Sequence, residues 1–116
     1  MAFKFENLQV WQKGLDLTND INQLTKSFPK EELYVLSPQI KRAADSVVLN
    51  IAEGCTGQSD AAFKQFLGYA LRSAIEVVSC LFIAQKRNII NEDDFKRLYE
   101  EYQSLTKMIT ALRNTL

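Results

Sequence analysis

The sequence predicts an all-α protein, an antiparallel up-down-up-down four-helix bundle in one domain covering residues 1–116. Apolar residues recur at steps of three and four along four segments, as they do on the buried face of a helix. Only two prolines and four glycines interrupt the chain, and no stretch alternates apolar and polar residues over the length of a strand. A composition of 47% hydrophobic and 24% charged residues suits a globular domain with a substantial core.

The first helix is predicted to run from about Glu6 to Ser27 and to stop before Pro29, because proline cannot continue a helix. Its apolar residues form two rows rather than one. The first row is Val10, Gly14, Leu17, Ile21 and Leu24, and the second is Leu8, Trp11 and Leu15. In the connector, residues 28–36, two glutamates follow the proline and predict one extra helical turn.

The second helix is predicted from Pro38 to Glu53. Ser37 is expected to cap its first turn, and Pro38 suits the first helical position, where its missing N–H would lack a partner anyway. Gly54 is expected to end the helix in the left-handed conformation. The predicted buried face is Ile40, Ala43, Ala44, Val47, Val48 and Ile51, and the residues that point away from it are Arg42, Asp45, Leu49 and Glu53.

The third helix is predicted from a cap at Ser59 to about Arg87, with Asn88 closing it. It carries two adjacent apolar rows, which together cover about half of its circumference. The first row is Phe63, Leu67, Ala70, Ala74, Val77, Leu81 and Ala84, and the second is Leu71, Ile75, Val78 and Phe82.

The fourth helix is predicted to begin after a cap at Asn91, with three acidic residues in its first turn, where the helix dipole favours anions. Its apolar residues give the clearest period in the chain and predict the seam of a left-handed bundle. This seam is Phe95, Leu98, Tyr102, Leu105, Ile109, Leu112 and Leu116.

The first and third helices thus carry more apolar surface than a four-helix monomer readily covers. Two explanations are open: a heavily buried third helix in a generous core, or oligomerisation through the surplus faces, which we favour. The residues expected at the interface are Trp11, Leu49, Leu71, Ile75 and Phe82.

The composition also argues against several classes of enzyme. The chain has no histidine, so the commonest metal ligand and the usual general base near pH 7 are both missing. Its two cysteines, Cys55 and Cys80, form no C-x-x-C pair, which argues against a zinc site. We therefore predict no catalytic residue, no metal site, no cofactor and no enzyme activity.

The sequence has no hydrophobic run near the length of about 18 residues that a membrane-spanning helix needs. The residues at its start also lack the apolar core of a signal peptide. We therefore expect a cytoplasmic protein with no membrane partner.

Basic residues suggest a nucleic-acid surface, since Lys41 and Arg42 begin the second helix and Arg72 lies on the third. The alternative is a solvated face balanced by Asp45 and Glu76. The residues alone favour the solvated face, because these basic residues do not all lie on one side and no aromatic residue is interleaved for base stacking.

Asn50 and Glu53 are the polar residues near the end of the second helix. One interpretation makes them a binding pair. The other, which we favour, is structural: Asn50 satisfies backbone groups near the connector, and Glu53 pairs with a basic neighbour.

Four segments in this order resemble a known family: FENLQVWQKG, FPKEELYVL, QIKRAADSVVLNIAEG and FKQFLGYALRSAIE. The chain resembles, over nearly its whole length, the bacterial four-helix bundle proteins encoded in intervening sequences of 23S ribosomal RNA genes. The resemblance implies an antiparallel four-helix bundle that assembles as a homopentamer. A related branch, the accessory variability proteins of diversity-generating retroelements, binds RNA and a reverse transcriptase through a basic surface.

By this resemblance, Lys41 and Arg42 are the best candidates for a nucleic-acid surface. Val35 departs from the family pattern, in which a glycine is common at this position, and the GCTGQS loop lacks an arginine often found there. We predict a non-enzymatic, homo-oligomeric accessory or scaffold protein that contacts RNA or a ribonucleoprotein. The alternative is a protein–protein adaptor that binds no nucleic acid.

Overall fold

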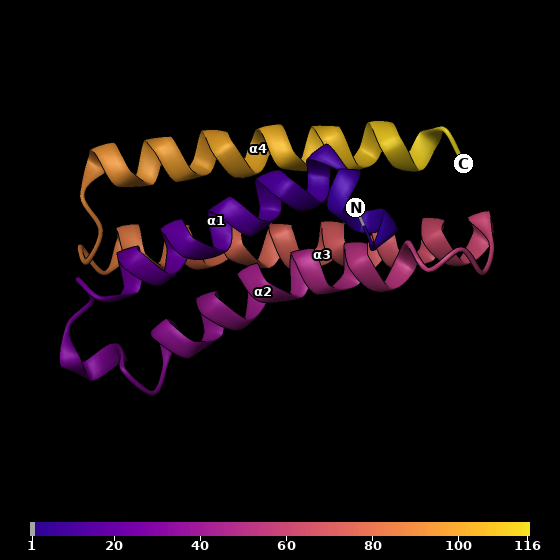
Figure 1. The fold of residues 1–116 in the computed structure, drawn as a ribbon. Helices are drawn as coiled ribbons and strands as arrows, with labels where there is room; N and C mark the ends of the chain where they lie inside the picture. The colour runs from indigo at the N-terminus through magenta and orange to yellow at the C-terminus, as the bar shows by residue number, and fades with distance from the viewer. Residues whose placement is uncertain (1) are drawn as a thin grey trace.

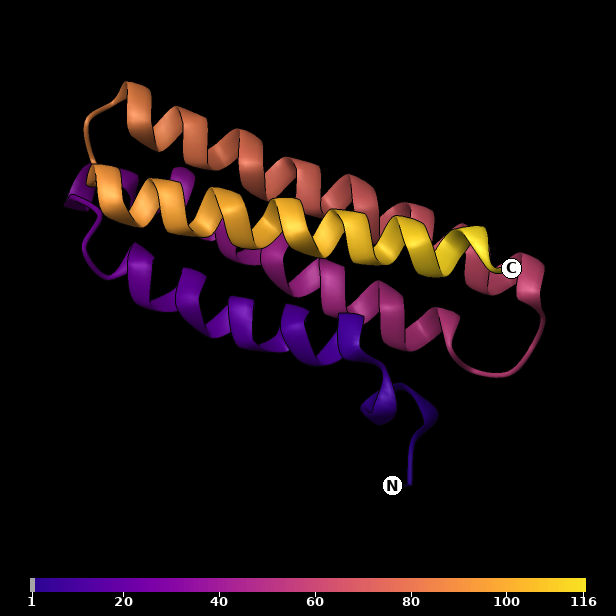
Figure 2. The same ribbon diagram turned by 90° about the horizontal axis from the view of Figure 1, so that it is seen from above.

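The computed structural model describes residues 2–116 and confirms the predicted all-α bundle (Figures 1 and 2). Four α-helices run alternately up and down, and two short 3-10 helices precede α1 and α2 (Figure 1). The elements are η1 (Lys4–Asn7), α1 (Gln9–Thr25), η2 (Lys30–Glu32), α2 (Leu36–Gly54), α3 (Asp60–Lys86) and α4 (Glu92–Asn114). Helices α1 and α3 each pack against both α2 and α4, which gives an elongated body of 43 × 22 × 22 Å.

The core consists of one apolar row from each helix, as the spacing predicts. In α2, all six residues of the predicted face are buried. The buried residues of α3 include Leu67, Ala70, Ala74, Val77, Leu81 and Ala84, and those of α4 are Leu98, Tyr102, Leu105 and Ile109. Burial of these rows is the main favourable contribution to the stability of the bundle.

Helix α1 begins three residues later than predicted, at Gln9, and ends at Thr25. The preceding residues form η1, in which the carboxylate of Glu6 accepts a hydrogen bond from the backbone N–H of Phe3 at 2.8 Å. The side chain of Gln12 donates to the backbone carbonyl of Glu6 at 2.7 Å. These two contacts hold Glu6 in a separate turn at the start of the bundle.

The predicted cap at Ser37 is wrong, because α2 begins at Leu36 and Ser37 is buried inside the first turn. The backbone N–H of Leu36 donates to the Glu32 carboxylate at 3.3 Å. This carboxylate belongs to η2, the predicted extra turn of the connector. A side chain from the preceding element therefore caps α2.

The predicted role of Gly54 is also wrong, because it is the last residue of α2 and has no left-handed backbone. A Cβ atom on Gly54 would lie 2.6 Å from the Cβ atom of Phe66 in α3. Glycine is therefore needed here for the close approach of two helices.

The other predicted helix ends are confirmed. The side chains of Ser59 and Asn91 accept hydrogen bonds from the first turns of α3 and α4, at 3.0 and 2.7 Å. Asn88 follows α3 in the left-handed region, with a φ of 59°. These local signals fix the ends of the two longest helices.

Helix α3 is long and apolar enough to cross a membrane by length and composition, since its mean hydropathy reaches 1.6 over 18 residues. No uninterrupted apolar run produces this value; it is an average over the two rows. In the bundle, α3 packs between α2 and α4 and supplies core residues along its whole length. It is the core helix of a compact bundle, although only 33% of that window is buried.

Candidate functional site

The second apolar row of α3 is only partly covered in the single chain. We call Leu71, Ile75, Val78 and Phe82 the α3 stripe. Ile75 is 62% exposed and Phe82 is 48% exposed, whereas Leu71 and Val78 are half-buried. Successive members are four, three and four residues apart, so they share one side of the helix. In the single chain, α3 is therefore less buried than the first explanation, a heavily buried third helix, expects.

An apolar groove between α3 and α4 adjoins the α3 stripe and has a volume of about 180 Å³. It is lined by Ile75, Val78, Tyr99, Tyr102, Gln103 and Thr106. Small-molecule sites are usually larger, about 300–1,000 Å³. The groove is large enough for an apolar side chain but smaller than a typical small-molecule site.

Phe82 is held against α4 by other aromatic rings. Its ring packs edge-to-face on Phe95 and Tyr99, with centroid distances of 5.2 and 5.9 Å. Aromatic pairs of this geometry add about 0.5–1.5 kcal/mol beyond area burial. The exposed half of the Phe82 ring is therefore presented on a fixed support.

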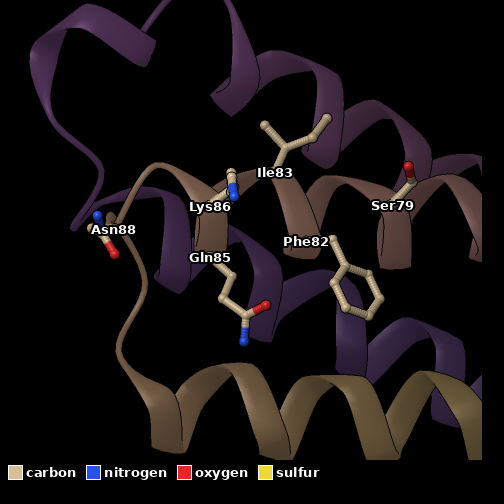
Figure 3. Close-up of a pocket in the computed structure, with 6 residues that line it drawn as sticks. All are labelled: Ser79, Phe82, Ile83, Gln85, Lys86 and Asn88. Carbon is tan, nitrogen blue, oxygen red and sulfur yellow. The ribbon is translucent and has the colours of Figure 1, made fainter.

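A larger, open hollow of about 690 Å³ lies at the C-terminal end of α3, and Figure 3 shows the residues that line it. Phe82 and Gln85 extend toward α4, whereas Ile83 lies on the opposite side of α3 (Figure 3). Because these side chains diverge, the hollow has no convergent set of polar groups for a ligand.

The two predicted interface residues outside α3 differ in exposure. Leu49 is 61% exposed on the outer face of α2, as its position in the helix predicts. Trp11 is half-buried, because the Phe5 ring of η1 packs on it with a centroid distance of 4.7 Å. The N-terminal turn therefore covers part of the surplus row of α1.

Lys41, Arg42 and Arg72 are all exposed, and none of the three ion pairs found among residues 2–116 includes them. Lys41 and Arg42 lie on α2, whereas Arg72 lies on α3. Lys41 and Arg42 are consecutive in a helix and so point about 100° apart. Arg42 donates to the Gln39 side chain at 3.4 Å, and Gln39 in turn donates to Glu76 of α3.

Arg72 has an aromatic neighbour that the sequence analysis did not anticipate. Its Cζ atom lies 5.9 Å from the centroid of the Tyr69 ring. The signal was available in the sequence, because residues three apart are neighbours on a helix surface.

Asn50 has a structural environment, although the predicted partner is wrong. Its side-chain amide donates to the backbone carbonyl and the hydroxyl of Ser46, one turn earlier in α2, at 2.8 and 3.0 Å. Ser73 of α3 donates to the same hydroxyl at 2.8 Å. The amide therefore belongs to a small polar contact between α2 and α3, and not to the connector.

Glu53 is exposed and takes part in none of the three ion pairs among residues 2–116, so the predicted pairing with a basic neighbour is wrong. The structure does not place it beside Asn50 in a hydrogen-bonded pair, since the amide of Asn50 is directed to Ser46. The interpretation of Asn50 and Glu53 as a binding pair stays a prediction.

The chain is similar to known proteins. A family model described as 23S rRNA-intervening sequence protein matches residues 6–111. The chain belongs to this family. No curated protein matches the chain.

A crystal structure at 1.70 Å resolution has the same fold as this 23S rRNA-intervening sequence family member. It is that of a protein of unknown function from the S23 ribosomal protein family of Bacteroides thetaiotaomicron VPI-5482. The TM-score is 0.83 at 24% sequence identity, covering 90% of this chain and 95% of the other. At this identity, the similarity establishes the fold alone.

Burial raises the pKa of two side chains of this family member, Tyr102 and Cys80. The Tyr102 side chain is 1% exposed, and its hydroxyl finds no hydrogen-bond partner among residues 2–116. Burial, with smaller contributions from Asp20 and Asp45, raises the pKa of Tyr102 well above its usual value.

The cysteines do not form a reactive pair. Cys80 is buried, and burial together with the charge of Glu76 raises the pKa of its thiol, which disfavours the nucleophilic thiolate. Across residues 2–116, no group of three or more His, Cys, Asp or Glu side chains is arranged to hold a metal ion. The expected lack of a metal, a cofactor and a catalytic residue stays a prediction.

Proposed function

We propose that this protein is a non-enzymatic scaffold of the cytoplasm that assembles into a homo-oligomer through the α3 stripe. The observation that carries this proposal is the exposure of Ile75 and Phe82, 62% and 48%, in one row beside an apolar groove. Burying apolar surface contributes about 25 cal/mol per Å² removed from water. Contiguous exposed apolar surface of this kind marks an association site.

The spacing of the α3 stripe supports contact with another helix. Steps of four, three and four are the a/d pattern by which helices interlock side by side. The neighbouring groove is open to receive an apolar side chain from such a helix. A second copy of the chain supplies exposed apolar residues of this kind on α2 and α1, where Leu49 and Leu15 are uncovered.

A ring of more than two copies fits this arrangement. In a ring, each subunit uses two different surfaces, and the assembly closes when the rotation between neighbours allows it. The α3 stripe lies toward α4, whereas Leu49 lies on the outer face of α2, so one chain presents two separate apolar surfaces. The family resemblance favours five copies, and we adopt the homopentamer as the proposed state.

The Ile75→Glu variant tests this role of the α3 stripe. A carboxylate at this position would have to be buried in the assembly, so we expect the variant to sediment as a smaller species than the wild type. The matched control is Gln23→Glu, which adds a carboxylate at an exposed position of α1. Analytical ultracentrifugation measures the size of the assembly for both variants. An unchanged assembly in Ile75→Glu would show that the stripe is not part of the interface.

Contact with RNA or a ribonucleoprotein is the second candidate function. It is favoured by Arg72, whose guanidinium lies over the Tyr69 ring, since arginine and aromatic side chains are common partners of stacked bases. The family resemblance adds Lys41 and Arg42 as candidate residues for contact with nucleic acid. If they contact phosphates, the affinity for structured RNA falls with salt and is weaker in Lys41→Glu/Arg42→Glu. No binding at low salt would leave the protein–protein adaptor as the alternative.

A further inference from the structure

One end of the α3–α4 face is strongly basic, although the chain as a whole has no net charge. Residues 61–74 of α3 and 102–114 of α4 contain four basic side chains and no acidic one: Lys64, Arg72, Lys107 and Arg113. The two segments lie side by side, because the Nε atom of Arg113 donates to the backbone carbonyl of Lys64 at 3.0 Å. The charge balance of the chain therefore hides a local excess of positive charge.

A hollow of about 450 Å³ lies within this basic surface, and we call it the Arg72–Arg113 pocket. Its lining is Gln65, Gly68, Tyr69, Leu71, Arg72 and Arg113. The lining includes two guanidinium groups and no carboxylate. An ordinary solvated face, by contrast, has charges of both signs interspersed.

Arg113 is held in place with part of its guanidinium free. Its Nε–H is used by the Lys64 carbonyl, and its two Nη groups have no hydrogen-bond partner among residues 2–116. The guanidinium lies over Gly68, since a Cβ atom built there would be 3.6 Å from Nη2 and 3.7 Å from Nε. The lack of a side chain at Gly68 leaves the space that Arg113 occupies.

Arg72 and Tyr69 supply further hydrogen-bond donors to the pocket. Arg72 makes no hydrogen bond to the protein among residues 2–116, and its guanidinium is positioned over the Tyr69 ring. The Tyr69 hydroxyl oxygen accepts a hydrogen bond from Gln65 at 2.7 Å. This leaves the hydroxyl proton of Tyr69 available to donate to a ligand.

We propose that the Arg72–Arg113 pocket binds a phosphate group. Guanidinium groups form paired, charge-assisted hydrogen bonds to the oxygens of a phosphate, and two of them offset a dianion. The inference deepens the RNA-contact candidate and rests on it only for the source of the phosphate. The pocket adjoins the α3 stripe through Leu71, which places it at the edge of the proposed interface.

Side-chain NMR tests the site directly. Inorganic phosphate and pyrophosphate are titrated into ¹⁵N-labelled protein at constant ionic strength, with chloride as the comparison anion. We expect saturable shifts of the Nε–H signals of Arg72 and Arg113 with both phosphates and none with chloride. The Arg97 signal, from a residue paired with Asp20, is the internal control. Equal shifts with chloride, or no saturation, would overturn the proposal.

Two variants separate charge from geometry. Arg72→Gln/Arg113→Gln should weaken pyrophosphate binding at least tenfold, whereas the control Lys96→Gln/Arg97→Gln, which also removes two charges from exposed positions, should not. Gly68→Leu keeps every charge but fills the space under Arg113, so it should weaken binding as well. Circular dichroism checks that each variant is folded. Unchanged binding in both test variants would contradict the site.

A fluorescein-labelled single-stranded RNA identifies the source of the phosphate. If RNA binds to the wild type, is displaced by pyrophosphate and fails to bind Arg72→Gln/Arg113→Gln, the source is the nucleic-acid backbone. If the phosphates bind and RNA does not, the site stands and the RNA-contact candidate falls. If RNA binds equally well to the double variant, RNA contacts another surface of the protein, and the phosphate that the pocket binds comes from another source.

Discussion

Glu32 and Arg87 join two distant parts of the bundle, because Nη1 of Arg87 donates to both carboxylate oxygens of Glu32 at 3.0 and 2.9 Å. Glu32 is only 9% exposed, and one of its oxygens also accepts the backbone N–H of Leu36. A single carboxylate therefore caps α2 and ties the end of α3 to the connector.

Replacing Glu32 by alanine should destabilise the fold. The change removes the cap of α2 and leaves the guanidinium of Arg87 without its partner, so we expect a loss of about 1–3 kcal/mol in the free energy of unfolding. Glu32→Gln keeps an acceptor oxygen and should lose less. Urea denaturation measures both, with exposed Glu31→Ala as the control. Equal stability of Glu32→Ala and the control would show that the contact contributes nothing.

Gly54→Ala should be destabilising although alanine is the better helix former. Its Cβ would lie 2.6 Å from Phe66 Cβ, and overpacking of this kind costs about 1–3 kcal/mol. Gly68→Ala is the matched comparison, because a Cβ there meets only ordinary contacts, and it should be neutral or stabilising by up to about 1 kcal/mol. Thermal unfolding ranks the two variants, and the reverse order would contradict the close α2–α3 approach.

Tyr102→Phe should not destabilise the protein at neutral pH, since the buried hydroxyl has no partner among residues 2–116. A difference should appear in alkali. The raised pKa keeps folded Tyr102 protonated, whereas the unfolded chain releases this proton above about pH 10, so wild-type stability falls as the pH rises past that point. The variant should lack this part of the loss. Denaturation at pH 8 and pH 11 tests this prediction. An equal loss of unfolding free energy in the wild type and in Tyr102→Phe would contradict a raised pKa of Tyr102.

The helices and their buried rows could be predicted from the sequence because their signals are local. Ser59 and Asn91 cap the helices they precede, and the spacing places Ile75 in a second apolar row, which the structure leaves partly exposed. Ser37 and Gly54 were misinterpreted because tertiary contacts determine their roles: the Glu32 carboxylate caps α2 from the connector, and Phe66 of another helix restricts Gly54.

The candidate site was only partly predictable for the same reason. Arg72 was identified, but Arg113 was missed because it reaches the pocket from another helix. The lack of acidic residues in 61–74 and 102–114 can be read from the sequence. It indicates a basic surface only once α3 and α4 are known to pack together. The different directions of Lys41 and Arg42, by contrast, could be predicted from the sequence, because consecutive residues of a helix point about 100° apart.

In the proposed assembly, another copy of the chain covers the α3 stripe. Light scattering coupled to size-exclusion chromatography tests it most directly, because it gives the mass of the wild-type particle in solution. We predict a mass larger than that of a dimer, and five times the 13.3 kDa of one chain for the proposed pentamer. A mass near 13.3 kDa at every protein concentration would contradict it.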